Sequence, residues 1–202
     1  MVVQPLMPLR PYQEQAIASV RIAVMQSDRA LLVMPTGSGK TVVFSEICRL
    51  ACDKNRKVLI LVHRRELVTQ ASDKLTRAGV EHGIIAAGFD PSDHPVQVAS
   101  VQTLIRRLNT SSFTPDLIII DEAHHAVAGS WDKIIGHFSD AKIIGVTATP
   151  SRLDGRGLGS HFSTLVSGPS VAQLTKLGFL SPHRVFAPPV IADLSNVKTR
   201  AG

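Results

Sequence analysis

The stretch Pro35-Thr36-Gly37-Ser38-Gly39-Lys40-Thr41 decides the fold of this chain. An apolar run, Ala30–Met34, precedes it, and a helical pattern, Lys40–Cys52, follows. A strand, a glycine-rich turn and a helix together make a phosphate-binding loop, in which backbone N–H groups and the helix N-terminus face an anion. Lys40 would place a full charge at the β- and γ-phosphates of a nucleotide, and Thr41 would offer a hydroxyl to Mg²⁺. The pattern departs from the general one at Met34, where glycine is usual.

A second motif supports this interpretation. The apolar run Leu117–Ile120 ends in Asp121-Glu122-Ala123-His124. Carboxylates at the C-terminal end of a parallel strand face the crevice in which α/β sheets bind ligands. We expect Asp121 to hold Mg²⁺ and Glu122 to orient or deprotonate an attacking water. An acidic pair that caps a helix is the alternative, and the phosphate loop upstream makes it the weaker one.

A third motif, Thr147-Ala148-Thr149-Pro150, follows the apolar run Ile143–Val146. By itself it indicates only a turn at the exit of a strand.

The three motifs, PTGSGKT, DEAH and TATP, resemble in order and spacing motifs I, II and III of the superfamily 2 helicases and translocases. Leu9–Gln13 (LRPYQ) resembles the adenine-recognising Q-motif region, Leu59–Leu67 resembles motif Ia, and Ser100–Leu104 resembles motif Ib or Ic. LRPYQ, DEAH followed by histidine, and TATP-x-R-x-D-G are most similar to the type III restriction subunit group and its bacterial DNA-repair relatives. The resemblance extends to about Pro182.

The resemblance implies an ATP–Mg²⁺ site and assigns roles to further residues. Gln13 would read adenine through its amide, which carries a donor and an acceptor, and Arg10 would lie in the same pocket. A polar position on the first helix is the simpler interpretation of Gln13. His124 would couple the nucleotide site to nucleic acid through Thr147 or Thr149. The alternatives for His124 are a core histidine and a metal ligand; a metal site on His124 and His125 is disfavoured, because adjacent side chains diverge.

The apolar runs and helical patterns alternate along the chain. Strands are predicted at 30–34, 58–62, 84–87, 96–99, 117–120 and 142–147, and helices at 12–25, 40–52, 64–78, 101–108, 131–137 and 171–177. Strands that are apolar throughout indicate a sheet covered on both faces. The fold class we predict is α/β: a three-layer RecA-like P-loop NTPase domain with a mostly parallel sheet.

Length and composition bound the organisation of the chain. It has 202 residues, of which 44% are hydrophobic, enough for one sizeable core. We expect residues 1–182 to form the ATP-binding domain, and 183–202 to be an exit strand and the start of a linker to a second RecA-like domain. That second domain, or a partner subunit, would supply an arginine finger. The apolar runs are too short for a membrane span, and Cys48 and Cys52 suit a reducing, cytoplasmic compartment.

Charge and aromatic content favour a nucleic-acid partner bound through its phosphates. The net charge is +6 and only 4% of residues are aromatic, so base-stacking platforms are scarce. Arg64, Gln102 and Thr103 are the candidate contacts, because each follows a strand at the ligand edge. We favour DNA over RNA. The alternatives are an RNA helicase domain and a nucleotide-gated binding or scaffold module that does not translocate.

Overall fold

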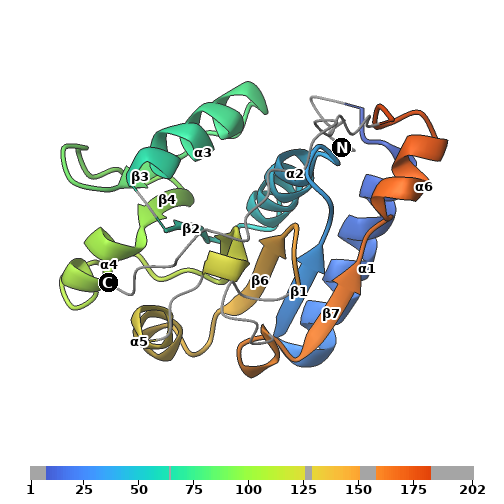
Figure 1. Ribbon diagram of the computed structural model, residues 1–202. Helices are drawn as coiled ribbons and strands as arrows, with labels where there is room; N and C mark the ends of the chain where they lie inside the picture. Colours follow the sequence, from blue (N-terminus) through green and yellow to red (C-terminus); the bar gives the residue numbers. More distant parts are fainter. Residues whose placement is uncertain (1–7, 64, 126–128, 151–157, 183–202) are drawn as a thin grey trace, which may run out of the picture.

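The computed structural model describes residues 8–63, 65–125, 129–150 and 158–182. Seven parallel strands form one sheet in the order β3-β4-β2-β5-β6-β1-β7 (Figure 1). The strands are β1 (Arg29–Val33), β2 (Val58–Val62), β3 (Gly83–Ile85), β4 (Val96–Ser100), β5 (Leu117–Asp121), β6 (Lys142–Thr147) and β7 (Thr164–Ser167). The predicted α/β class and parallel sheet are therefore confirmed.

Helices connect the strands and cover the sheet. They are α1 (Pro11–Ser27), α2 (Lys40–Cys52), α3 (Arg65–Arg77), α4 (Val101–Arg107), α5 (Ser130–His137) and α6 (Val171–Lys176), with short 3-10 turns η1 (Ala123–His125) and η2 (Leu158–Ser160). The predicted helices agree with these to within a few residues at each end. In the described part of the chain, no helix is both long and apolar enough to cross a membrane.

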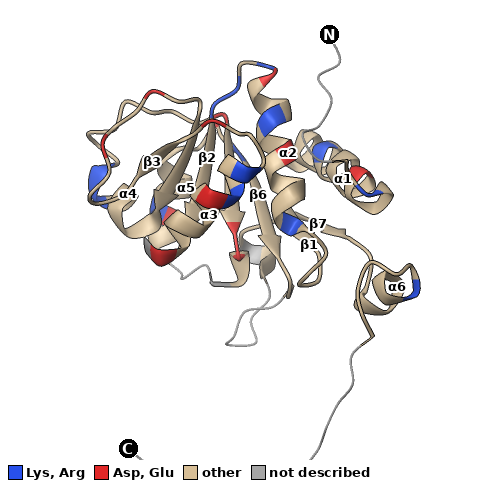
Figure 2. Cartoon of the chain, turned by 90° about the horizontal axis from the view of Figure 1, so that it is seen from above, with Lys and Arg blue, Asp and Glu red and all other residues tan. Residues whose placement is uncertain are grey.

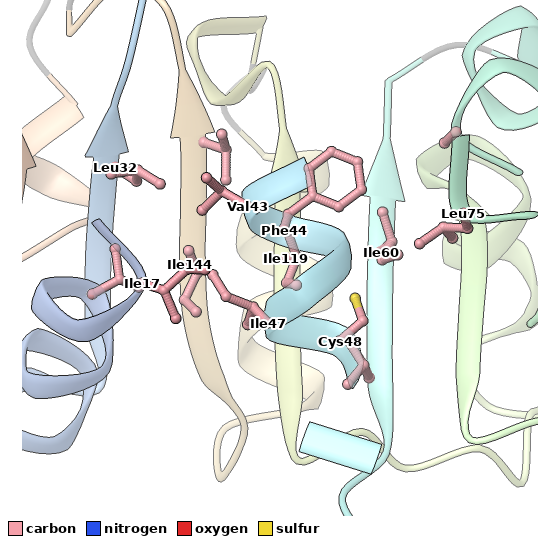
Figure 3. Close-up of a cluster of buried hydrophobic side chains, with 14 of the residues drawn as sticks. Ile17, Leu32, Val43, Phe44, Ile47, Cys48, Ile60, Leu75, Ile119 and Ile144 are labelled. Atoms are coloured by element: carbon pink, nitrogen blue, oxygen red, sulfur yellow. The ribbon is translucent and has the colours of Figure 1, made fainter. Parts of the chain in front are cut away.

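The two faces of the sheet bury two separate apolar clusters, which makes three layers. Within β2, Val58, Ile60 and Val62 belong to the cluster that α1, α2 and α3 cover, whereas Leu59 and Leu61 belong to the cluster that α4 and α5 cover. Figure 3 shows how Phe44 and Ile47 of α2 lie over the sheet on the first face. All five residues of β2 are buried, as a strand covered on both faces requires. Lys, Arg, Asp and Glu lie mainly on the surrounding helices and loops (Figure 2).

The strand β7 was not predicted from the sequence. It has four residues, and its side chains alternate between half-buried and exposed, so it lacks the apolar run that marks the other strands. It lies at the edge of the sheet, beside β1.

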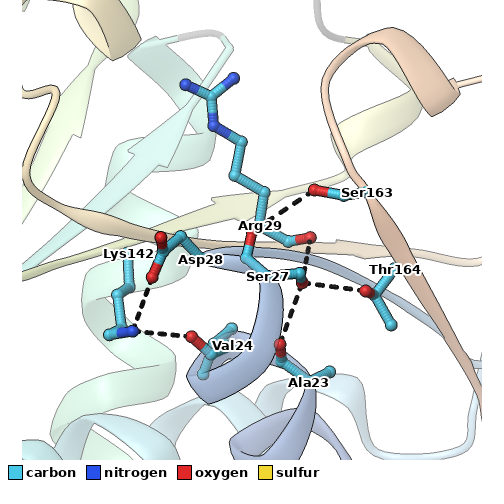
Figure 4. Close-up of polar contacts among 8 residues, drawn as sticks. All are labelled: Ala23, Val24, Ser27, Asp28, Arg29, Lys142, Ser163 and Thr164. Carbon is cyan, nitrogen blue, oxygen red and sulfur yellow. Dashed lines mark hydrogen bonds and ion pairs between the residues drawn. The ribbon is translucent and has the colours of Figure 1, made fainter.

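A set of polar contacts at the end of α1 holds β6 and β7 in place (Figure 4). Lys142 Nζ donates to the carbonyl of Val24 at 2.8 Å and to Asp28 Oδ1 at 2.7 Å. Thr164 Oγ1 donates to Ser27 Oγ at 2.9 Å. These contacts lie at the amino ends of the strands, opposite the phosphate loop.

Several predicted segments lie outside the described residues. They are Arg64, residues 151–157, which continue the TATP-x-R-x-D-G pattern, and the predicted exit strand at 183–202. The proposed boundary at residue 182 is therefore still a prediction.

Substitution of Gly145 in β6 would test how tightly the apolar cluster under α4 and α5 is packed. A Cβ at this position would collide with the ring of Phe162 and lie 2.9 Å from Leu31 Cδ1. We expect Gly145→Ala to lower the free energy of unfolding by about 1–3 kcal/mol, the usual cost of overpacking. Urea denaturation measures this. Gly136→Ala is the matched control, because a Cβ at Gly136 in α5 meets nothing within 4 Å, so this variant should be neutral or more stable. Equal effects of the two changes would contradict the packing argument.

Candidate active site

The phosphate loop runs from the end of β1 into α2. Gly37 and Gly39 have φ values of 81° and 82°, a left-handed conformation that favours glycine. Ser38 is fully buried, and its backbone N–H and its hydroxyl both donate to the carbonyl of Pro35, at 3.2 and 2.6 Å. The chain is thereby curled so that α2 begins at Lys40, with the first N–H groups of the helix directed at the loop.

Met34 stands where phosphate loops usually have glycine, and the structure explains how it is accommodated. Its side chain is fully buried, and its backbone N–H donates to the carbonyl of Thr147 at 2.9 Å. Gly168, which follows β7, lies against it, since a Cβ at Gly168 would come within 2.8 Å of Met34 Cγ. The missing glycine is therefore compensated by a glycine from another segment.

The loop and the acidic motif meet at the carboxyl edge of the sheet. In the sheet order, β6 lies between β1, which leads into the loop, and β5, which ends at Asp121. Thr147 pairs with Val33 and Val146 pairs with Asp121, so the last residues of the three strands are level. The sheet thus brings together Lys40, Asp121, Glu122, His124 and Thr147.

Asp121 lies in an electrostatically unfavourable place. Burial raises the pKa of its carboxyl, as does the negative charge of Glu122, while the charges of Lys74 and Lys40 act in the opposite direction. Asp121 Oδ1 accepts the backbone N–H of Glu122 at 3.0 Å. Glu122 itself has a φ of 50°, which is uncommon for a residue with a side chain and is typical of functional sites.

His124 forms the hydrogen bond to Thr147 that was expected from the resemblance. The distance from His124 Nδ1 to Thr147 Oγ1 is 2.9 Å. Thr147 Oγ1 also lies 2.9 Å from the carbonyl of Thr149, to which it can donate its hydrogen; in that arrangement Nδ1 of His124 is the donor to Thr147. The same nitrogen lies 3.3 Å from Glu122 Oε2. One histidine nitrogen therefore contacts both the acidic motif and the end of β6.

Arg10, Tyr12 and Gln13 lie beside the loop, at the start of α1. Gln13 is only 4% exposed; its Oε1 accepts the backbone N–H of Arg10 at 2.9 Å, and its Nε2 donates to the carbonyl of Ser38 at 3.1 Å. Both ends of the amide are thus engaged within the protein, so reading adenine would require Gln13 to exchange one of these bonds. Tyr12 was not predicted to take part, yet its hydroxyl donates to the same Ser38 carbonyl at 2.8 Å.

The candidate nucleic-acid residues lie apart from the loop. Gln102 and Thr103 are in the first turn of α4, after β4, with Gln102 exposed and Thr103 half-buried. Since β2 and β5 separate β4 from β6, these residues occupy the same edge of the sheet at a different position.

The oxygen ligands of this site suit a cation that is coordinated partly by the protein and partly by the phosphates of a nucleotide. Among the described residues, no group of three or more His, Cys, Asp or Glu side chains could hold a metal by itself. Thr41 and Asp121 offer a hydroxyl and a carboxylate, the hard oxygen ligands that Mg²⁺ prefers when substrate phosphates supply the rest. Cys48 and Cys52 are free thiols on α2, and burial raises the pKa of both.

Comparisons with known proteins identify relatives of this chain. Residues 6–152 match the family described as type III restriction enzyme, res subunit. The putative ATP-dependent helicase IRC3 of Saccharomyces cerevisiae is 37% identical over 214 residues, covering 96% of this chain and 31% of the yeast protein. A type I restriction enzyme EcoAI endonuclease subunit of Escherichia coli is 32% identical, covering 96% of this chain and 26% of that subunit.

Solved structures share the fold. The Pyrococcus furiosus Hef helicase domain aligns with a TM-score of 0.64 and 26% identity, over 79% of this chain and 38% of that one. The chain therefore spans roughly a third of the length of the relatives it matches.

The raised pKa of Asp121 predicts a gain in stability when its charge is removed. The folded protein binds this proton more tightly than the unfolded chain does, so above the raised pKa the ionised carboxylate destabilises the fold. Asp121→Asn keeps the oxygen that accepts the Glu122 N–H. We expect it to raise the free energy of unfolding of the nucleotide-free protein at neutral pH, with the gain shrinking as the pH falls through the wild-type pKa of Asp121. Denaturation curves at several pH values measure this.

The matched control for that experiment is Asp73→Asn on α3, because Asp73 is exposed. It should change stability by less than about 0.5 kcal/mol at every pH. A loss of stability in Asp121→Asn at neutral pH would contradict the electrostatic description of the site.

Proposed function

Since the chain belongs to the family of the type III restriction enzyme res subunit, we propose that it is the ATP-binding motor domain of an ATP-dependent DNA helicase or translocase. The observation that supports this most directly is the meeting of the phosphate loop, Lys40, Asp121 and Glu122 at one edge of the sheet. Parallel sheets of this kind bind their ligands at that edge.

Each residue of the site has a role in this proposal. Backbone N–H groups within Thr36–Thr41 hold the phosphates, and Lys40 carries positive charge to the β- and γ-phosphates. Thr41 and Asp121 hold Mg²⁺, which neutralises phosphate charge when bound. Glu122 accepts a proton from the attacking water. Arg10 and Gln13 face the adenine.

The hydrogen bond of His124 connects the acidic motif to the end of β6. His124 Nδ1 lies within 3.3 Å of Glu122 and 2.9 Å of Thr147, and Thr147 contacts the backbone of Thr149. Loss of the γ-phosphate changes the charge that Glu122 faces, so His124 would shift its preference between Glu122 and Thr147. We propose that this exchange links hydrolysis to the segment that follows β6.

DNA is the nucleic acid along which we propose that the motor moves. Arg64, Gln102 and Thr103 are the proposed phosphate contacts, and the net charge of +6 favours a polyanion. One relative is named DNA 3'-5' translocase XPB2 and another is named putative ATP-dependent RNA helicase L396; we propose DNA, and the assays below compare the two. Translocation also requires a second RecA-like domain, from a longer chain or from a partner, to close on the nucleotide and supply an arginine finger.

Two free thiols fit a cytoplasmic location.

Removal of the Lys40 charge should weaken nucleotide binding. We expect Lys40→Ala to bind ATP–Mg²⁺ roughly 10- to 100-fold less tightly than wild type, the range that a charge-assisted hydrogen bond contributes. Calorimetric titration measures this. Lys54→Ala is the matched control, because Lys54 is an exposed lysine beyond the other end of α2. Equal affinities of wild type and Lys40→Ala would refute the phosphate site.

Replacement of Glu122 should separate binding from hydrolysis. Glu122→Gln has the same backbone requirement and nearly the same shape, but its amide cannot accept the proton. We expect ATP affinity to be retained and the hydrolysis rate to fall by about 10²- to 10⁴-fold. Single-turnover assays, with the protein in excess over ATP, suit the slow hydrolysis expected of one domain. Assays with duplex DNA, single-stranded DNA and RNA identify the track: stimulation by RNA alone would overturn the DNA assignment, and unchanged hydrolysis would exclude Glu122 as the base.

A further inference from the structure

Residues from the two ends of the described chain meet beside the phosphate loop. Phe179, which follows α6, lies against Arg10 and Tyr12, which precede and begin α1. The Arg10 Cζ atom is 4.8 Å from the centroid of the Phe179 ring, and the rings of Tyr12 and Phe179 are 5.2 Å apart at an interplanar angle of 62°. Arg10 Nη1 also donates to the Tyr12 hydroxyl at 3.2 Å. The three side chains therefore form one cluster.

The position of Phe179 is fixed by the end of α6. Gly178 has a φ of 74°, and the backbone N–H groups of Phe179 and Leu180 both donate to the carbonyl of Leu174, at 2.9 and 3.2 Å. Leu174 is fully buried in the first apolar cluster, with Phe179 and Leu180 packed against that cluster. The turn after α6 is thus anchored to the core by its backbone and its side chains.

The same turn contacts the phosphate loop. Leu180 Cδ2 lies only 2.9 Å from the place that a Cβ would occupy at Gly37, so Leu180 packs directly on that glycine. On the other side, Tyr12 connects the cluster to the loop through its 2.8 Å hydrogen bond to the Ser38 carbonyl. Phe179 therefore lies at a fixed position relative to the site where the phosphates of a nucleotide would bind.

Arg10 has the properties of a surface for a nucleobase. Its side chain is exposed despite its contacts with Phe179 and Tyr12. A guanidinium is planar and weakly hydrated, and it stacks well on aromatic rings and bases. An unsupported arginine would lose about 2 kcal/mol of rotamer entropy when it is ordered by a ligand. The Phe179 ring and the Tyr12 hydroxyl restrict it beforehand, which reduces that loss.

We propose that Phe179 is a positioning residue for the nucleobase: it holds the Arg10 guanidinium in place to stack on the purine ring of a nucleotide whose phosphates lie on the loop. This inference rests on the proposed ATP site. Stacking contacts the face of the base and not its hydrogen-bonding edge. The contact should therefore increase the affinity for a nucleotide relative to a phosphate chain that has no base.

The test compares ATP–Mg²⁺ with tripolyphosphate–Mg²⁺, which has the phosphates but no base. In calorimetric titrations of the chain, Phe179→Ala should bind ATP roughly three- to tenfold less tightly, as expected for the loss of a cation–π contact and its ordering effect. Its affinity for tripolyphosphate should be unchanged. Phe179→Tyr should restore ATP binding, since it keeps the ring. Leu177→Ala is the matched control, because Leu177 belongs to the same turn but is 61% exposed.

A double-mutant cycle identifies the residue through which Phe179 acts. Arg10→Ala should weaken ATP binding by itself, and adding it to Phe179→Ala should cost little more, since the two residues act as one unit. If Phe179→Ala does not fold, as judged by its thermal unfolding, Phe179→Leu takes its place with the same expectations.

The outcomes separate this inference from the proposed function. Equal losses of ATP and tripolyphosphate in Phe179→Ala would show that Phe179 only supports the loop, and an unchanged ATP affinity would show that it does not act on the base; either result overturns the inference. If the wild-type protein binds neither ligand, the proposed ATP site itself is wrong.

Discussion

Burial of the parallel sheet on both faces is the constraint on which the rest of this structure depends. Strands β2 and β4 are buried along their whole length. β2 is apolar throughout, and the buried Gln97 of β4 donates its amide hydrogens to the carbonyls of Ser92 and His94. Side chains that could bind a charged ligand therefore lie at the strand ends, where loops begin and backbone N–H groups of the next helix are free. The phosphate loop, Asp121 and Thr147 are all at such ends, and the parallel register brings them level with one another.

The same constraint explains how far the sequence could predict the molecule. Apolar runs identified six strands, all of them mostly buried except the short edge strand β3. The glycines of Pro35–Thr41 identified the loop. β7 escaped prediction because an edge strand with alternating exposure carries no such run. The contacts of Gln13 with Ser38, and of Phe179 with Arg10, also escaped, since they join residues that only the folded sheet brings together.

The strain at the acidic motif is consistent with a site built for a ligand. Glu122 adopts a positive φ, and burial next to Glu122 raises the pKa of Asp121. Neither feature benefits the empty protein, whose fold would be more stable with an uncharged residue at 121. The electrostatic cost at Asp121 is relieved by a cation near it, because a positive charge offsets the unfavourable burial and the repulsion between the carboxylates. The loss of folding stability is thus confined to the place where ligand binding can offset it.

The two halves of the proposed nucleotide site depend on the fold to different degrees. The phosphate half is local, since β1, the loop and α2 follow one another in the chain. The base half is not: Arg10 and Phe179 lie at opposite ends of the described sequence, and they meet because β7 pairs with β1 and is tied to the end of α1 through Thr164 and Ser27. β7 in turn leads into α6, whose terminal turn carries Phe179. The strand with the weakest sequence signal therefore leads to the side chain that supports the proposed base position. A change that detaches β7 would spare the phosphate loop and disrupt the surface next to Arg10.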